Sequence, residues 1–168
     1  MIKRLEAKYI SDIANVHRLA WQKAFKGILS DTLLSSLTDQ EFAEHWSNTI
    51  TQVDRTNLIK VMGDDKAIGF VSFGPSRAVQ ETVRSEIYGL YLHPAYWNQM
   101  IGYELISQAI EYLTKENDYN GIILWTMTEN LRSRAFYEKV GFQPTDRIRR
   151  AQRNHEFFDE IHYQYVAP

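Results

Sequence analysis

The stretch from Arg84 to Leu113 limits the fold most, because it predicts a strand, a loop and a helix in succession. Ser85 to His93 is rich in Ile, Tyr and Leu and predicts a strand, which Pro94 ends because proline cannot donate to a ladder. From Gly102 onward the apolar residues recur at helical spacing. The first amides of a helix lack intrahelical partners and lie at its positive end, so the loop before this helix predicts an anion site. An ordinary strand-helix unit is the alternative for this stretch taken alone.

A second stretch, from Gly121 to Phe142, adds a more specific pattern. It predicts an apolar strand, then Asn130, then a short helix that ends at Gly141. Together the two stretches resemble the GNAT superfamily of N-acetyltransferases. The resemblance covers residues 57–142 well and the ends more loosely. The matching residues are E-I-Y-G-L-Y-L-H-P, the I-G that ends the loop, and N-L-R-S-R-A-F-Y-E-K-V-G-F.

The rest of the chain predicts two N-terminal helices and several short strands. Ser11 or Asp12 can cap the first helix, and Thr38 with Glu41 forms a capping box for the second, after a turn at Ile28 to Asp31. The remaining strands are predicted at Ile2–Glu6, Leu58–Met62, Ala67–Phe73, Arg147–Arg153 and Phe157–Val166.

The predicted element order is therefore β-α-α-β-β-β-α-β-α-β-β, which is an α/β fold. The resemblance implies a GNAT-like mixed, mostly antiparallel central sheet of about seven strands flanked by helices. It also implies that the fourth and fifth strands splay apart and admit the pantetheine arm of acetyl-CoA.

Composition excludes several classes of function. A length of 168 residues predicts one domain over residues 1–168, and a net charge of −2 argues against broad nucleic-acid binding, which needs a basic face. Without cysteine there is no disulfide, thiolate metal site or cysteine nucleophile, and we predict no metal site. The N-terminus lacks the apolar core of a signal peptide, and no apolar run approaches the length of a membrane span. We therefore expect a cytoplasmic protein that makes no membrane contact.

Two residues are candidates for proton transfer. Transfer of an acetyl group from a thioester to an amine requires that the amine lose a proton and that the leaving thiolate be stabilised. The resemblance implies that Glu86 accepts the proton, often through water; a solvent-facing strand carboxylate is the alternative. It implies that Tyr137 donates a hydrogen bond or proton to the sulfur, with a core aromatic as the alternative.

The resemblance also implies the residues that bind acetyl-CoA, the acetyl donor. Backbone groups of Leu90 and Leu92 would pair with the pantetheine amides, and Asn130 would contact the same arm while capping a helix. Arg132 and Arg134 are candidates for the phosphates, with solvated helix arginines as the alternative. The pyrophosphate is expected at Asn98, Gln99, Met100, Ile101, Gly102 and Tyr103.

The loop departs from the family pattern at two positions. The family usually has Arg or Gln, two residues, Gly, one residue, then Gly or Ala. Here Trp97 and Met100 replace the first residue and the first glycine, and only Gly102 is kept. Glycine can take a positive φ and lets phosphate approach the backbone. We expect a modestly rearranged loop in which Met100 takes an ordinary conformation and packs against Tyr96 or Trp97.

An aromatic acceptor pocket is expected on the other side of the thioester. Trp21 and Phe25 lie four residues apart and share a helix face, where core packing is the alternative; Tyr88 is the third candidate. The arginines between Arg147 and Arg153 could attract an acidic acceptor, with a solvated hairpin as the alternative.

These observations predict an N-acetyltransferase that moves the acetyl group of acetyl-CoA directly to a primary amine of a small molecule or a protein. The alternative is a catalytically weak GNAT-like domain that binds an acyl-CoA or a protein partner without turnover. A nucleotide enzyme is disfavoured because no P-loop or dinucleotide fingerprint occurs. A homodimer is left open.

Overall fold

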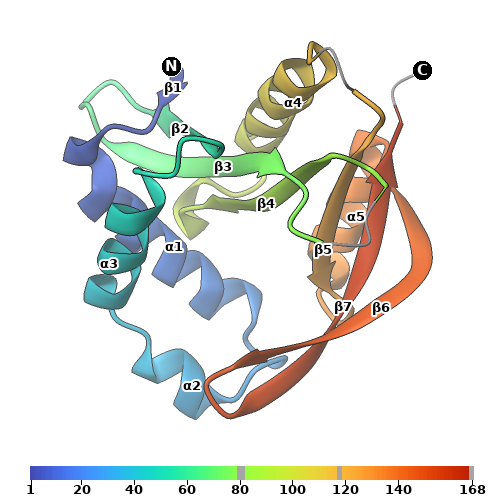
Figure 1. The fold of residues 1–168 in the computed structure, drawn as a ribbon. Helices are drawn as coiled ribbons and strands as arrows, with labels where there is room; N and C mark the ends of the chain where they lie inside the picture. The colour runs from blue at the N-terminus through green and yellow to red at the C-terminus, as the bar shows by residue number, and fades with distance from the viewer. Residues whose placement is uncertain (79–81, 117–118, 167–168) are drawn as a thin grey trace.

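A seven-stranded sheet forms the centre of the protein in the computed structural model, which describes residues 1–78, 82–116 and 119–166 (Figure 1). The strand order is β1-β2-β3-β4-β5-β7-β6, and all neighbours run antiparallel except β4 and β5. This confirms the predicted mixed, mostly antiparallel sheet. The strands are β1 Ile2–Arg4, β2 Thr56–Val61, β3 Ala67–Pro75, β4 Ser85–Leu92, β5 Ile122–Met127, β6 Gln143–Arg153 and β7 Glu156–Tyr165.

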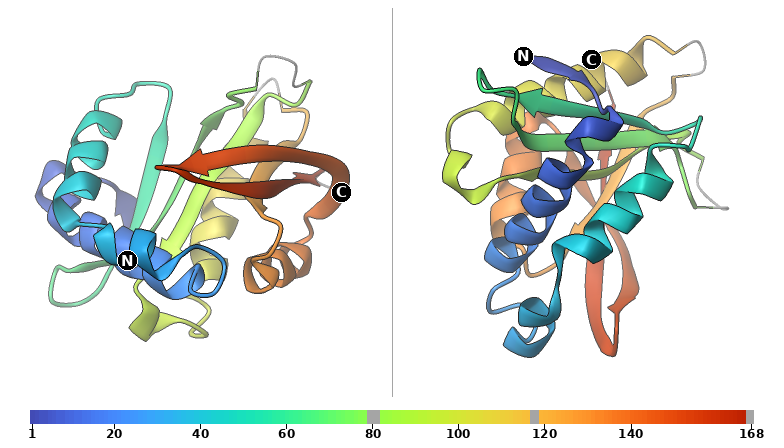
Figure 2. Two further views of the ribbon diagram at one scale, coloured as in Figure 1. Left: turned by 90° about the horizontal axis from the view of Figure 1, so that it is seen from below. Right: turned by 90° about the vertical axis from the view of Figure 1, so that its left-hand side faces the viewer.

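Helices cover both faces of this sheet (Figures 1 and 2). On one face α1 and α3 enclose a core that includes Trp46 and Phe70, and on the other α4 and α5 enclose a core that includes Leu105 and Tyr163. The α-helices are α1 Ile10–Ala24, α2 Asp31–Ser36, α3 Asp39–Thr49, α4 Ile101–Thr114 and α5 Leu131–Val140, with 3-10 turns η1 Ala7–Tyr9 and η2 Pro94–Tyr96.

Local capping explains most helix ends. The capping box predicted at Thr38 and Glu41 is present at the start of α3. The expected cap of α1 is wrong: the helix begins after η1, and the Asp12 carboxylate instead accepts the backbone N–H of Ala67 at 3.0 Å. The turn predicted at Ile28 to Asp31 continues into α2, which was not predicted. The Ser30 hydroxyl caps this short helix by accepting the Leu33 N–H at 3.1 Å.

The parallel strands β4 and β5 separate after a short paired segment. They pair only from Ser85 to Ile87 on β4, opposite residues 122–124. Beyond that point β4 continues along β3, and β5 continues along β7 as far as Met127. Near the separation, Ser72 pairs with Gly89 while Phe73 pairs with Ile87, so β4 carries one extra residue, which is a β-bulge. The sheet is therefore open between β4 and β5.

The hairpin of β6 and β7 extends across to the N-terminal helices. Its Glu156 carboxylate accepts the backbone N–H of Ser30 at 3.0 Å and also the Ser30 hydroxyl. These bonds join the hairpin tip to the start of α2, which lies beside it in Figure 1. The hairpin and α1 thus enclose the region in front of the opening in the sheet.

Candidate active site

A cavity of about 540 Å³ lies at the opening between β4 and β5. Its wall joins both faces of the sheet, because Trp21 and Phe158 belong to the core under α1, whereas Phe136 and Tyr137 belong to the core under α4 and α5. We name its two walls by their residues. The loop side consists of residues 97–100, 102–103, 130, 132–133 and 136–137, and the aromatic side of Trp21, Phe25, Tyr88, Tyr91, Trp125 and Phe158 with Glu160.

The loop before α4 keeps a left-handed turn despite the loss of glycine. Met100 has a φ of 63°, and so does Asn98. The expectation of an ordinary conformation for Met100 is therefore wrong: the fold requires the turn whichever residue occupies it. The Met100 side chain is 64% exposed, so it adds little to the core. The first amides of α4, those of Ile101, Gly102 and Tyr103, lack intrahelical partners by their position.

Trp97 stands where the family has a basic or amide residue, and it is fixed by two contacts. Its indole N–H donates to the Leu92 carbonyl at 2.9 Å. The guanidinium of Arg132 lies 4.3 Å from the Trp97 ring centre and donates to the Asn98 side-chain oxygen at 2.9 Å. The loop side thus carries a cation supplied by α5, one of the two arginines that the sequence proposed for the phosphates.

Arg134, which was predicted to meet phosphates, is engaged elsewhere. It donates to the Tyr163 hydroxyl at 3.1 Å and to the Thr128 carbonyl at 3.0 Å, and it does not line the cavity. Of the other loop-side candidates, Ile101 is buried in the core, whereas Asn98, Gln99, Met100, Gly102 and Tyr103 line the cavity with Leu90 and Leu92.

Asn130 and Tyr137 both reach the cavity from α5. Asn130 is 6% exposed, and its side-chain oxygen caps the helix by accepting the Ser133 N–H at 3.2 Å. Tyr137 is buried, and its hydroxyl has no hydrogen-bond partner among the residues that the structure describes. Burial, and then the neighbouring Tyr91, raises the pKa of Tyr137. Tyr137 therefore lies where the loop side meets the aromatic side, and its hydroxyl stays protonated at neutral pH.

Glu86 is buried and forms an ion pair with Arg77, whose side chain is half-exposed. Glu86 is 1% exposed and accepts three hydrogen bonds from Arg77: the backbone N–H at 2.9 Å, Nε at 3.2 Å and Nη2 at 2.5 Å. The alternative of a solvent-facing carboxylate is wrong. Glu86 does not line the cavity, although Ile87 and Tyr88, which follow it on β4, do.

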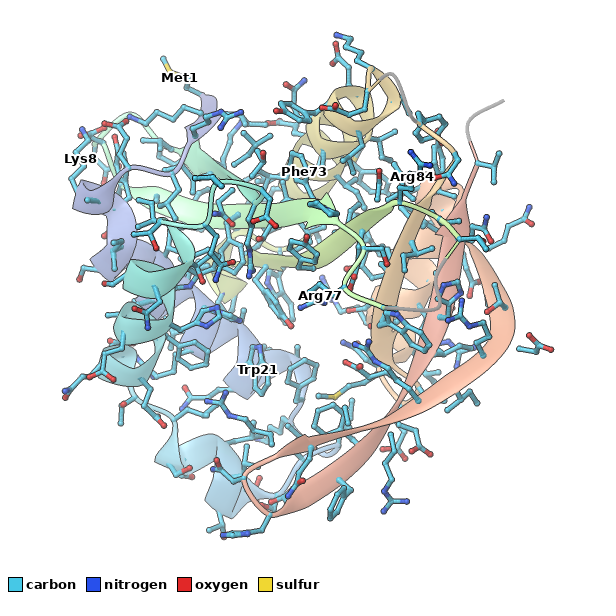
Figure 3. The ribbon with its side chains drawn as sticks, viewed as in Figure 1. Met1, Lys8, Trp21, Phe73, Arg77 and Arg84 are labelled. Atoms are coloured by element: carbon cyan, nitrogen blue, oxygen red, sulfur yellow. The ribbon has the colours of Figure 1, made fainter. Side chains whose placement is uncertain are left out.

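The aromatic side brings together the predicted Trp21, Phe25 and Tyr88. The rings of Trp21 and Phe25 meet edge to face at 4.9 Å. Tyr88 donates to the Pro75 carbonyl at 2.5 Å, and burial followed by the Glu86 charge raises its pKa to about 12. The guanidinium of Arg77 lies 4.4 Å from the centre of the Tyr88 ring. Arg77 and Trp21 are labelled in Figure 3.

The sequence did not single out Trp125 and Glu160, which also line this side. Glu160 is the only carboxylate of a described residue in the cavity wall, and Arg149 donates to it at 2.6 Å. Trp125 and Glu160 are near each other because Glu160 pairs with Met127 across β5 and β7, two positions along the strands from the pair of Trp125 and His162.

Two features are absent from the described residues: a group of metal-ligating side chains and a helix able to cross a membrane. No cluster of His, Cys, Asp and Glu suited to a metal ion occurs in that part of the chain. None of the helices formed by those residues has the length and apolar character of a membrane span.

Comparison with known proteins places this geometry in context. The profile of the acetyltransferase (GNAT) family matches residues 15–142. The chain is 31% identical over 134 residues to the uncharacterised N-acetyltransferase YuaI of Bacillus subtilis, which covers 77% of this chain and 74% of that protein. It is 26% identical over 152 residues to a spermidine N(1)-acetyltransferase of Thermoplasma acidophilum, covering 86% and 89%. A crystal structure of the PaiA N-acetyltransferase from Thermoplasma acidophilum in complex with coenzyme A superposes with a TM-score of 0.72 at 21% identity, covering 98% of both chains.

Proposed function

Since the chain belongs to the acetyltransferase (GNAT) family, whose members transfer an acetyl group from acetyl-CoA, we propose that it acetylates a primary amine directly. The opening between β4 and β5 carries this proposal, because one cavity there reaches both faces of the sheet. A donor entering from the loop side and an acceptor entering from the aromatic side would meet at Tyr137 and Tyr91 without a covalent enzyme intermediate.

The loop side suits the donor. Partnerless first-turn amides of α4 and the Arg132 guanidinium present N–H donors and positive charge to a pyrophosphate. The β4 backbone from Gly89 to Leu92 has no β5 partner, so its outward amide groups are available to the pantetheine arm, except the Leu92 carbonyl, which accepts the Trp97 indole N–H.

The transfer itself forms one bond and breaks one. The amine nitrogen attacks the thioester carbonyl, the carbon–nitrogen bond forms, the carbon–sulfur bond breaks, and the amine loses a proton. We assign the Tyr137 hydroxyl to the sulfur, where it donates a hydrogen bond or a proton as negative charge develops. This assignment is supported because the Tyr137 hydroxyl stays protonated and has no hydrogen-bond partner in the described part of the chain.

Glu86 remains our candidate for the proton acceptor, acting through water. Three N–H groups of Arg77 already use its carboxylate, and Tyr88 and Ile87 rather than Glu86 line the cavity. The proton would therefore reach Glu86 through a chain of water molecules or after the ion pair with Arg77 loosens. Mutagenesis of Glu86 tests this assignment.

The experiment is a thiol-release assay combined with calorimetry. Acetyl-CoA at one hundred times its dissociation constant should add about 2.7 kcal/mol to the stability, and release of free CoA should depend on an added amine. Binding without release for any amine or peptide N-terminus would favour the alternative of a domain that holds acyl-CoA without turnover. Absence of both heat and a melting shift at millimolar acetyl-CoA would contradict both readings.

A further inference from the structure

Buried N–H donors without acceptors gather around the aromatic side of the cavity. Among the described residues, three buried side-chain polar atoms lack a hydrogen-bond partner: Trp21 Nε1, Trp125 Nε1 and Arg153 Nε. All three are donors. Trp21 and Trp125 line the cavity, and the Arg153 guanidinium lies 5.3 Å from the Trp21 ring centre. A buried donor without an acceptor costs roughly 1–3 kcal/mol, so this cluster indicates that an oxygen acceptor belongs here.

Of the three donors, Trp21 Nε1 gives the weakest evidence for a missing acceptor, because the Tyr91 hydroxyl lies nearby. Trp21 lies close enough to the Tyr91 hydroxyl to lower that group's pKa slightly against the larger effect of burial, which raises it to about 12. The indole N–H nevertheless lacks the geometry of a hydrogen bond. Trp125 and Arg153 therefore carry the argument.

Positive charge surrounds the same side. Alternate residues of β6 share one face of a strand, and Arg147, Arg149 and Arg153 follow this spacing. The first two place their guanidinium groups 5.5 and 4.4 Å from the Trp125 ring centre. Arg149 is matched by Glu160, as Arg77 is matched by Glu86, whereas Arg153 has no carboxylate partner in the described part of the chain.

Arg55 adds a second cation without a carboxylate partner among the described residues. Its Nε donates to the Ser72 hydroxyl at 2.7 Å, and its guanidinium lies 4.8 Å from the centre of the Tyr88 ring. Arg147 and Arg149 are exposed, as the solvated-hairpin alternative expected, but their guanidinium groups lie over the Trp125 ring, and that of Arg153 lies over the Trp21 ring. An acceptor with a second positive charge would meet net repulsion here.

We propose that the acceptor amine also carries an oxyanion, a carboxylate or a phosphate-like group, which binds against the indole N–H groups of Trp21 and Trp125 beside Arg153. This inference rests on the proposed amine acetylation and names its substrate class. The oxyanion supplies the acceptor that the buried donors lack, and it balances the charge of Arg153.

The test compares amines that differ only in the group at the far end. ω-Amino acids of three to six carbons are measured beside the n-alkylamine and the α,ω-diamine of equal length. We expect kcat/KM for the best amino acid to exceed that of its alkylamine by about tenfold or more, with the diamine poorest. An aminoalkylphosphonate in the same series distinguishes a phosphate-like group from a carboxylate. Alkylamines or diamines that are better at every length would overturn the proposal.

Two matched variants locate the subsite. Arg153→Gln should lower the ratio of kcat/KM for the amino acid to that for the alkylamine by about tenfold, the size expected for a hydrogen-bonded charge. Arg150→Gln, from the same run of arginines, is the control, because Arg150 lies over Phe157 whereas Arg153 lies over Trp21, and it should leave the ratio unchanged. Trp125→Phe keeps a ring and removes the N–H, so it tests the same point if Arg153→Gln folds poorly.

The experiment distinguishes a failure of amine acetylation from a failure of the oxyanion subsite. If no amine releases CoA, transfer to amines fails, and titration of the same compounds into the complex with CoA still decides the subsite. Amino acids that bind more tightly than alkylamines there support the subsite. Equal or reversed affinities refute it.

Discussion

Replacement of Met100 by glycine tests how the loop binds the donor. A non-glycine residue with a φ near +60° costs roughly 1–2 kcal/mol, and Met100 adopts 63°. Glycine removes that cost but makes the unfolded chain more flexible, at roughly 0.4–1 kcal/mol. Little packing is lost, because the side chain is 64% exposed. Met100→Gly should therefore stabilise the protein by about 0.5–1 kcal/mol.

The same variant should bind acetyl-CoA more tightly. Without the Cβ and the long side chain, the pyrophosphate can approach the backbone before the first turn of α4. We expect a gain of tenfold or less, which corresponds to up to about 1.4 kcal/mol. Titration calorimetry gives the affinity, and urea unfolding without ligand gives the stability.

Met100→Ala is the matched control, because it removes the side chain and keeps the Cβ. It should leave the backbone strain in place and gain no stability. Weaker binding by the glycine variant would mean that Met100 itself contacts the donor. A loss of stability in the glycine variant would refute the strain argument.

Three further predictions concern other buried groups. Glu86→Gln should lower turnover by roughly 10²–10⁴-fold at neutral pH and by less at high pH, where the amine is already deprotonated. Arg77→Gln is the control, because it breaks the same ion pair but keeps the carboxylate. Unchanged turnover in Glu86→Gln would remove Glu86 from the mechanism. Tyr137→Phe should reduce turnover while the melting temperature and acetyl-CoA affinity change little, because the hydroxyl has no partner in the described residues; unfolding without a kinetic defect would support a purely structural ring. His17, enclosed by aromatic rings, accepts the Trp46 indole N–H at 3.2 Å, and burial places its pKa well below the usual value. Its contribution is complete above about pH 6.5 and is lost as the pH falls, by up to about 1.4 kcal/mol per pH unit; urea unfolding at pH 7.5 and 5.5 should show a weaker pH dependence for His17→Gln, and an equal dependence would contradict this reasoning.

Local sequence signals predicted what depends on neighbours along the chain. The capping box at Thr38 needs only Glu41 three residues later, and the cap at Asn130 needs only the Ser133 amide. Hydrophobic periodicity placed the strands and α4 for the same reason. The sequence does not predict the short helix α2, because six residues carry almost no periodicity and the cap at Ser30 has the same pattern as a turn.

Long-range contacts were beyond such signals. The ion pair of Glu86 depends on Arg77, which follows a different strand, and no spacing rule connects the two. The turn at Met100 was misjudged because residue preference favoured an ordinary φ, whereas the start of α4 fixes the backbone there. Propensity is a weak guide where tertiary structure decides the conformation.

The exchange at Trp97 shows how a motif can change while its role is kept by another residue. Read alone, the loss of a basic or amide residue from the loop suggests a weaker phosphate site. In the folded protein the Trp97 ring provides a surface on which Arg132 rests, and Asn98 holds the same guanidinium by a hydrogen bond. We infer that α5 supplies the cation which the loop has lost. Arg132→Gln should therefore weaken acetyl-CoA binding more than Arg134→Gln, because only Arg132 lines the cavity, and calorimetry showing equal losses would refute the exchange.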